Sequence, residues 1–324
     1  MLNNQTRRGF LFGAGAVCLS STGNVAHAAL SSAKHDDSLS IIMADVHLAK
    51  RGLKTIWGEQ PDYQNIIFSQ TVDKILEMRP LPRRVVVLGD VSLWFGYKAD
   101  YETAFPLFAR LKSAGIDVHL VPGNHDHREP MISVFPECAE RSPVKGRIAS
   151  VVNLGTCDLF LVDSLQASPD GEGANNPVGG QLDEEQGKWL SDVAEKAKRP
   201  FIVASHHSVK ELRLKDKSLL GFLSKKKYYC GYINGHVHQW TTSWCPKSWD
   251  NRNITRMASL PSVGWWGDIG FAVIRTKSDC AELTNVQSDF FYSSPLKKGD
   301  ARPASWDAIV RNNNGQKCTF SYGS

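Results

Sequence analysis

The sequence predicts an α/β fold in which parallel strands alternate with crossover helices. In the first half of the chain, short apolar and β-prone runs alternate with amphipathic segments in the order β-α-β-α-β. Each apolar run also ends in Asp, Asn or His. Loops at the carboxyl ends of strands carry the chemistry of such folds, so we expect the functional residues there.

The elements of the first half are defined by hydrophobic periodicity and by helix-breaking residues. Apolar side chains at helical spacing predict helices at about 62–78 and 99–113, which Pro80 and Gly115 bring to an end. Apolar runs predict strands at 39–44, 84–88 and 116–121. The last of these strands leads into the polar loop Pro122 to His127.

The second half repeats this theme without a sequence repeat. Residues 148–153 and 158–163 flank Gly155-Thr156 and predict a hairpin, and 164–180 has loop composition. A helix is expected at 182–198, then a basic and partly helical insert at 210–227. Further strands are expected at 201–205, 228–234, 240–245, 253–260, 270–276 and 281–286.

Composition and charge are those of an ordinary globular protein. The 324 residues are 42% hydrophobic and 10% aromatic, which suits one large domain or two small ones. The formal net charge is +5, and two of these charges, Arg7 and Arg8, lie in a leader. That balance is too mild to indicate a stable nucleic-acid partner or a membrane surface.

The first 28 residues resemble a bacterial twin-arginine export signal. Arg7-Arg8 precede a short apolar run, and Ala26-His27-Ala28 is a small-x-small site with cleavage expected after Ala28. The run is too short to cross a bilayer, which needs about 20 residues, so we expect no membrane span in the mature chain. The expected localisation is periplasmic or secreted, through the twin-arginine translocation machinery, with residues 29–38 as a linker.

Seven cysteines fall to six once the leader is removed, and none forms a C-x-x-C pair. A structural zinc site is therefore not expected. Disulfides and buried free thiols both remain open for the six.

Histidines concentrate at the ends of the expected strands. Nine remain after the leader, and seven lie in these loops: His47, His125, His127, His206, His207, His236 and His238. Neutral imidazoles and carboxylates that converge from several loops suit a transition metal with open positions. Two ions about 3.5 to 4 Å apart need a shared carboxylate, and Asp90 is the natural bridge.

Five motifs occur in the order and approximate spacing of the calcineurin-like metallophosphoesterase superfamily, which the chain resembles over about residues 39–275. They are Asp45-x-His47, Gly89-Asp90, Gly123-Asn124-His125-Asp126, His206, and Gly235-His236-x-His238. The resemblance implies a four-layer αββα sandwich of two mixed sheets, with a metallophosphoesterase domain at 39–290 and a C-terminal extension at 291–324. It implies one ion held by Asp45, His47, Asp90 and His238, and another held by Asp90, Asn124, His206 and His236.

The resemblance also implies a mechanism and a substrate class. His125 would protonate the leaving oxygen or stabilise the transition state, while a hydroxide bridging two Mn, Fe or Zn ions attacks a small phosphate mono- or diester. Asp163-Ser164 and the helix that follows resemble the bacterial phosphodiesterases of the cyclic-nucleotide type. A phosphodiesterase restricted to cyclic nucleotides and a non-catalytic phosphate-binding protein on the same scaffold are the alternatives.

Several residues near these motifs are left with two interpretations. His127 and His207 either support the ligands or contact substrate. The basic insert either overhangs the site and attracts an anion or is a solvated face. Asp126 is expected to shape its loop as a hydrogen-bond acceptor. Many relatives carry Asp or Tyr three residues after the bridging Asp, whereas this chain has Leu93, so the sequence leaves open what orients His125.

Overall fold

The computed structural model describes residues 34–50, 54–55, 58–59, 63–166, 179–215, 217–246, 254–264, 268–287 and 313–323. The leader, half of the linker and most of the C-terminal extension lie outside these residues, so their assignments stay predictions. No helix in the described part is long and apolar enough to span a bilayer.

One six-stranded sheet carries the strands expected in the first half of the chain. Its order is β16 (Lys317–Ser321), β15 (Cys280–Gln287), β14 (Gly270–Thr276), β1 (His35–Met43), β4 (Leu81–Leu88) and β5 (Asp117–Val121). β1, β4 and β5 are parallel, as the alternation with helices predicts, and β14 to β16 add antiparallel neighbours. The sheet is therefore mixed.

A second six-stranded sheet is built from strands that lie between Ser150 and Ser259. Its order is β12 (Thr241–Pro246), β13 (Ile254–Ser259), β11 (Tyr229–Asn234), β8 (Phe201–Ser205), β7 (Asp158–Leu161) and β6 (Ser150–Asn153). β6 and β7 form the expected antiparallel hairpin, whereas β7, β8, β11 and β13 are parallel neighbours. β2 (Lys54–Thr55) pairs with β3 (Gly58–Glu59), and β9 (Arg213–Leu214) pairs with β10 (Lys217–Ser218), in two separate hairpins.

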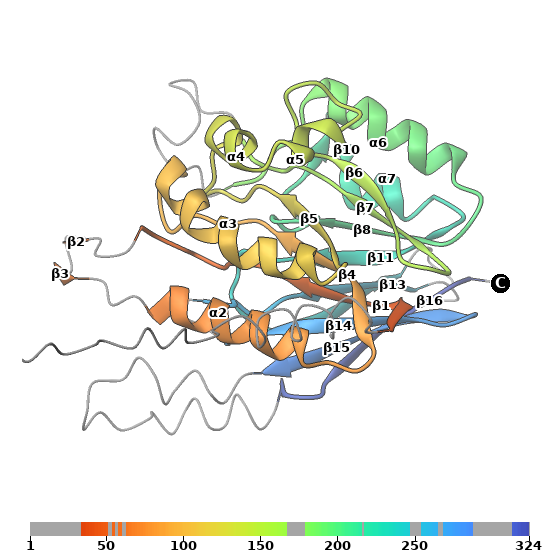
Figure 1. The fold of residues 1–324 in the computed structure, drawn as a ribbon. Coiled ribbons are helices and arrows are strands. Elements are labelled where there is room, and N and C mark those ends of the chain that lie inside the picture. The colour runs from red at the N-terminus through yellow and green to blue at the C-terminus, as the bar shows by residue number, and fades with distance from the viewer. Residues whose placement is uncertain are drawn as a thin grey trace, which may run out of the picture.

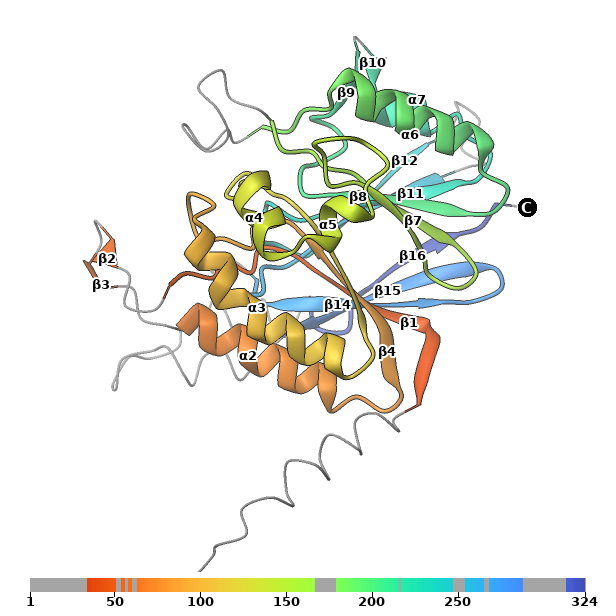
Figure 2. The ribbon, with the colours of Figure 1, turned by 45° about the horizontal axis from the view of Figure 1, so that its top comes forward.

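Three hydrophobic cores separate four layers. α2 (Tyr63–Leu76) and α3 (Lys98–Ser113) pack on the outer face of the first sheet through Phe68 and Phe108. α6 (Glu184–Lys196) and α7 (Leu219–Leu223) cover the second sheet through Leu190 and Leu223. The third core lies between the sheets. Figures 1 and 2 show the strands between these two pairs of helices, and the predicted αββα sandwich is confirmed.

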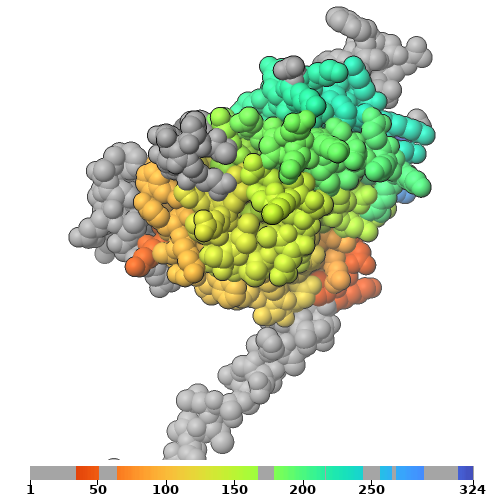
Figure 3. Space-filling view, turned by 90° about the horizontal axis from the view of Figure 1, so that it is seen from above, coloured from red at the N-terminus to blue at the C-terminus, as the bar shows by residue number. Residues whose placement is uncertain are grey.

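Two short helices, α4 (Arg128–Val134) and α5 (Glu137–Glu140), follow the loop after β5. Seen from above, the yellow residues of this region lie against the green residues of the second half of the chain (Figure 3). The region that follows β5 and the second half of the chain thus meet on this face.

Two strands extend beyond the sequence prediction. β1 starts at His35, inside the expected linker, because His35 and Asp36 pair with Leu81 and Pro82 before a register shift. These residues are only partly buried, so no apolar run marks them. β16 lies within the expected C-terminal extension, where only Cys318 and Phe320 face the core. Two apolar side chains at alternate positions are too few to identify a strand.

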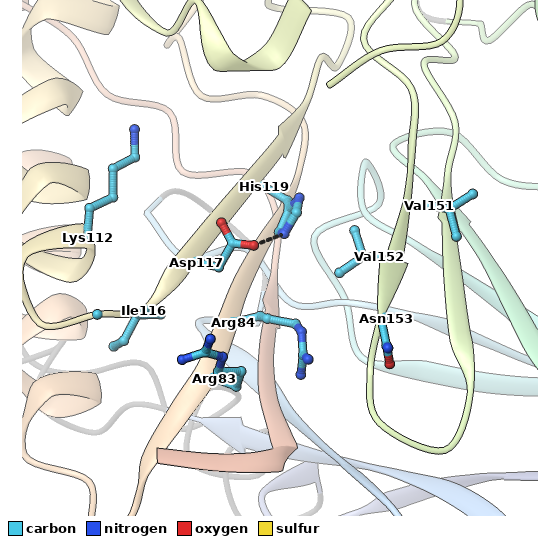
Figure 4. A pocket seen from close by; sticks show the side chains of 10 residues that line it. Arg83, Arg84, Lys112, Ile116, Asp117, His119, Val151, Val152 and Asn153 are labelled. Carbon is cyan, nitrogen blue, oxygen red and sulfur yellow. Dashed lines mark hydrogen bonds and ion pairs between the residues drawn. The ribbon is translucent and has the colours of Figure 1, made fainter. Parts of the chain in front are cut away.

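A cleft of about 540 Å³ lies at the amino ends of β4 and β5 (Figure 4). Figure 4 shows Arg83, Arg84 and Asp117 on these strands, opposite Val152 on β6. Strands rise about 3.3 Å per residue, so the cleft is separated from the loop that contains Asp90 by most of the length of β4. It contains none of the expected ligands.

The five cysteines whose side chains the structure describes are free: Cys138, Cys157, Cys230, Cys280 and Cys318. Burial raises the pKa of both the Cys138 and the Cys157 thiol to about 12. These two thiols are therefore protonated and unreactive near neutral pH.

Candidate metal centre

The expected ligands lie in loops that follow β1, β4, β5, β8 and β11, at the facing ends of the two sheets. Six non-glycine residues in the described part of the chain have positive φ, and five of them are expected ligands: Asp45 (58°), His47 (52°), Asp90 (52°), His236 (71°) and His238 (54°). This backbone region costs such residues about 1 kcal/mol or more each. Strain concentrated on one set of side chains indicates that their positions serve a function.

Backbone hydrogen bonds join the first two loops. Asp45 N donates to Gly89 O at 3.0 Å, and His47 N donates to Asp90 O at 2.8 Å. Because β1 and β4 are parallel neighbours, these bonds continue their pairing past the strand ends. They place the Asp45, His47 and Asp90 side chains together.

Glycine at position 123 leaves room for the Asp90 carboxylate. A Cβ at Gly123 would lie 2.2 Å from Asp90 Oδ1 and 2.6 Å from Asp90 N. Since real Cβ atoms do not approach that closely, any larger residue would displace Asp90. The glycine of the Gly123-Asn124-His125 motif is therefore a packing requirement of the site.

The first ligand group is Asp45, His47, Asp90 and His238, the set implied for one ion. One ligand atom from each lies within 4.8 Å of the others, and all four side chains are buried. His47 Nε2 is 3.1 Å from His238 Nε2, and His238 Nε2 is 3.2 Å from Asp45 Oδ1. The structure thus brings all four together, as the resemblance implies.

The second ligand group contains Asn124, His206 and His236. His206 Nε2 lies 2.9 Å from Asn124 Oδ1 and 3.2 Å from His236 Nδ1. Asp90 Oδ2 lies 3.3 Å from His206 Nε2 and 3.8 Å from His47 Nε2, so one carboxylate oxygen faces both groups. This is the position that a bridging carboxylate needs.

Burial keeps the imidazoles neutral, which is the form that binds metal. Burial lowers the pKa of His47 and of His206 well below the usual value. His206 Nδ1 donates to Leu88 O at 2.9 Å, and His47 Nδ1 donates to Leu93 O at 3.3 Å. These bonds fix the proton on Nδ1 and leave each Nε2 lone pair directed at the ligand groups.

The carboxylates need positive charge that the described residues do not supply. Asp45 and Asp90 are almost fully buried, and no Lys or Arg in the described part of the chain pairs with either. Burial and the neighbouring Asp45 charge raise the pKa of Asp90 well above its usual value. Buried carboxylates among neutral imidazoles, with no thiolate in either group, fit two transition-metal ions.

A backbone carbonyl orients His125. His125 Nδ1 donates to Trp94 O at 3.1 Å, and His125 N donates to Asp90 Oδ1 at 2.8 Å. His125 Nε2 then lies 4.0 Å from Asp90 Oδ2, at the edge of the ligand groups. The sequence could not identify this partner, because a backbone oxygen is present at every residue. Leu93, at the position where many relatives carry Asp or Tyr, does not take this role.

Asp126 shapes the loop, as expected. It accepts hydrogen bonds from Gly123 N (2.9 Å), Ser92 N (2.9 Å), Val91 N (3.2 Å) and the Tyr101 hydroxyl (3.0 Å). Burial raises the pKa of Asp126 to about 6. The loops after β4 and β5 are therefore joined through one fully buried side chain.

His127 and His207 lie beside the ligands in different ways. His127 N donates to the Tyr101 hydroxyl at 2.8 Å, and a Cβ at Gly96 would touch the His127 ring, so His127 supports the loop after β4. His207 is fully buried and forms a third ligand-type group with His206 and His236. Its Nδ1 lies 2.9 Å from Ser164 Oγ. For both histidines, these positions favour a role in supporting the ligand loops over contact with the substrate.

A buried ion pair that the sequence did not identify links the two sheets near the site. Arg128 Nε and Nη2 each donate to Asp163 at 2.7 Å, and both side chains are at least 95% buried. Arg128 follows the loop after β5, and Asp163 follows β7. The available signal was the position of Arg128, two residues after the Gly123-Asn124-His125-Asp126 motif.

The basic insert, residues 210–227, pairs with acidic side chains of α6. Lys215 pairs with Glu184 at 3.2 Å, and Lys226 pairs with Glu195. These contacts favour the solvated-face interpretation over attraction of an anion to the site.

Comparison with known proteins agrees with this geometry. The model of the calcineurin-like phosphoesterase family matches residues 40–240, which is more than half of the chain and contains both ligand groups. The chain belongs to the calcineurin-like phosphoesterase family. This phosphoesterase is accordingly a metal-dependent phosphoester hydrolase.

Several solved structures match this chain at low sequence identity, and the first of them shares its fold. A dimetal phosphatase from Danio rerio is 14% identical and has a TM-score of 0.60, with 88% of this chain and 99% of that chain covered. PhoD is 10% identical with a TM-score of 0.49, covering 76% and 65%. A putative 5'-nucleotidase from Staphylococcus aureus is 13% identical with a TM-score of 0.43, covering 85% and 57%. No curated protein matches significantly.

Proposed function

We propose that this phosphoesterase is an exported hydrolase of small phosphate mono- or diesters that works with two transition-metal ions. Asp45, His47, Asp90 and His238 hold one ion, and Asp90, Asn124, His206 and His236 hold the other. The observation that carries this proposal is the position of Asp90 Oδ2, which faces both groups at 3.3 and 3.8 Å.

When bound, the two ions polarise the phosphoryl oxygens and lower the pKa of water, which makes a nucleophile available near neutral pH. The ligands are held in place by the strained loops and by the Nδ1 bonds of His47 and His206. Asp90 keeps the two groups in register, and its other oxygen fixes the backbone of His125.

His125 donates a proton to the leaving oxygen, or a hydrogen bond to the phosphoryl group. With Nδ1 bound to Trp94 O, Nε2 is the nitrogen available to the substrate. Burial lowers the pKa of His125, so in the chain alone the neutral ring predominates near pH 7. Donation from Nε2 therefore requires a protonated ring. The negative charge of the substrate phosphate favours this form because it raises the pKa of His125.

The proposed localisation rests on the leader. Residues 1–28 would direct the folded chain through the twin-arginine translocation machinery to the periplasm or the medium. Imidazole, amide and carboxylate ligands without thiolates suit Mn, Fe or Zn. Which of the three is bound depends on its availability during folding.

Hydrolysis of p-nitrophenyl phosphate and of its bis ester, by protein reconstituted with each metal in turn, tests the proposal. We expect activity on at least one ester and a fall of about 100-fold or more in Asp90→Asn. The matched control is Asp73→Asn, which changes a half-exposed carboxylate on α2 and should leave the rate unchanged. The proposal fails if no metal supports hydrolysis, or if Asp90→Asn is as active as the control.

Two further outcomes identify the alternatives. Activity on cyclic nucleotides with none on either nitrophenyl ester would support the restricted phosphodiesterase. Fewer than two ions per chain by metal analysis, with phosphate-ester binding but no turnover, would support the non-catalytic protein.

A further inference from the structure

Three aromatic rings extend outward from His125. The Trp94 ring contacts the His125 ring at a centroid distance of 5.3 Å and an interplanar angle of 69°. Phe95 follows at 6.5 Å from Trp94, and Tyr97 lies 5.7 Å from Phe95. We refer to Trp94, Phe95 and Tyr97 as the aromatic ladder; it begins at His125 and ends in solvent.

The outer rings of the ladder are exposed. Phe95 is 46% and Tyr97 is 58% accessible, although rings of this size are usually well buried. In the described part of the chain, six large hydrophobic side chains are exposed, and three of them lie in ligand loops: Phe95, Tyr97 and Val237. Exposed apolar surface that gathers around one site indicates a binding function.

The loop that carries the ladder is rigid. Ser92 Oγ donates to Asp100 at 2.6 Å and accepts from Gly96 N at 3.0 Å. Gly96 has a φ of 59°, and a Cβ there would lie 2.4 Å from His127 N, so only glycine fits this turn. The backbone that carries the outer rings is therefore fixed before a ligand arrives, which lowers the entropic cost of binding.

The position of the ladder identifies the part of the substrate that it contacts. Under the proposed function, on which this inference rests, His125 faces the leaving oxygen, so the leaving group lies on the His125 side of the phosphorus. The Trp94 ring contacts the His125 ring edge-on, so the ladder begins at the residue that faces the leaving oxygen. Lys98, the cation next to Tyr97, pairs with Glu102 at 3.9 Å. The outer end of the ladder is formed by two exposed rings, Phe95 and Tyr97.

We propose that the aromatic ladder is the leaving-group subsite, and that the preferred substrates are phosphoesters whose leaving alcohol is planar and aromatic. Such a group would lie along the ladder, with its oxygen at His125 Nε2 and its rings toward Phe95 and Tyr97. Small aliphatic or charged alcohols would gain little from the rings.

The test compares paired substrates in Phe95→Ala and Tyr97→Ala, using the metal-loaded protein and whichever ester type it hydrolyses. The 1-naphthyl ester is compared with the ethyl ester, and each variant is referred to wild type on the same substrate, so intrinsic leaving-group reactivity cancels. We expect each variant to lower kcat/KM for the naphthyl ester about 3- to 10-fold, because aromatic pairs contribute that much. For the ethyl ester we expect less than a 2-fold change.

The matched control is Phe105→Ala. Phe105 is 48% exposed, like the ladder residues, but it lies further along α3 and stacks on Phe135 at 6.0 Å. This control should change neither kcat/KM. Calorimetric Kd values for naphthylphosphonate and methylphosphonate, which are not hydrolysed, give a second measurement that does not depend on turnover.

The two hypotheses fail differently. If wild type hydrolyses esters and both variants affect the naphthyl and ethyl compounds equally, the leaving-group subsite is wrong while the proposed function stands. If wild type hydrolyses nothing, the proposed function is wrong. The phosphonate Kd values then decide the ladder by themselves: an unchanged naphthyl preference in both variants overturns it, and a lost preference supports an aromatic-phosphate binding site.

Discussion

Replacing Arg128 with methionine is expected to destabilise the fold by about 3 kcal/mol. Arg128 is 4% exposed and donates twice to Asp163, which is fully buried, and once to Leu165 O at 2.6 Å. Methionine keeps much of the side-chain volume but leaves a buried carboxylate without its cation.

The magnitude follows from what remains around Asp163. Removal of one partner of a buried ion pair costs about 3 to 5 kcal/mol. Asp163 keeps two backbone donors, Ile148 N at 2.9 Å and Leu165 N at 3.1 Å, which places the cost at the lower end. Asp163→Asn in the Arg128→Met background removes the unpaired charge. We therefore expect the double variant to be more stable than the sum of the single variants by about 1 to 3 kcal/mol.

Urea denaturation followed by circular dichroism gives the free energy of unfolding for each variant. The control is Lys98→Met, which breaks a pair whose side chains are 58% and 59% exposed, and it should change stability by less than about 0.5 kcal/mol. A loss in Arg128→Met no larger than that of the control would refute the reasoning, as would strict additivity in the double variant.

Further expectations concern the site, its ions and a distant carboxylate. Gly123→Ala forces Asp90 to move, so activity should fall about 100-fold, measured as kcat/KM, while far-ultraviolet circular dichroism is unchanged. Chelation should lower the melting temperature, and restoring a metal at one hundred times its Kd should return about 2.7 kcal/mol of stability. Asp117 lies in the cleft of Figure 4, where a hydrogen bond from His119, assisted by Arg141, lowers its pKa to about 2. A lowered pKa stabilises the fold above the ordinary value of 3.8, and the effect is lost as pH falls towards 2. Asp117→Asn should therefore cost about 1 kcal/mol at pH 7, an amount reduced for a carboxylate that is nearly half exposed, and only a small part of that at pH 2, where half of the Asp117 carboxyls are protonated. An equal loss in urea titrations at both pH values would contradict this.

The sequence was informative where the cause of structure is local. Hydrophobic periodicity and turn-forming residues located the strands that carry ligands, because buried parallel strands have apolar sequences that end abruptly. The same runs carry Asp45, Asp90, Asn124 and His206 at their ends, so the ligands could be named before any distance was known. Strand ends in which few side chains are buried, such as the start of β1 and all of β16, gave no such pattern.

Tertiary structure alone decided how those residues work together. The sequence by itself placed histidines and carboxylates at the ends of the expected strands, and its resemblance to a known family implied the ligand set and metal-dependent phosphoester hydrolysis. It could not show that Trp94 O orients His125, that Arg128 meets Asp163, or that the aromatic ladder is exposed beside His125. The physical reason is that a backbone carbonyl has no sequence identity, and a buried pair or an exposed ring is defined by neighbours that only folding brings within a few ångströms.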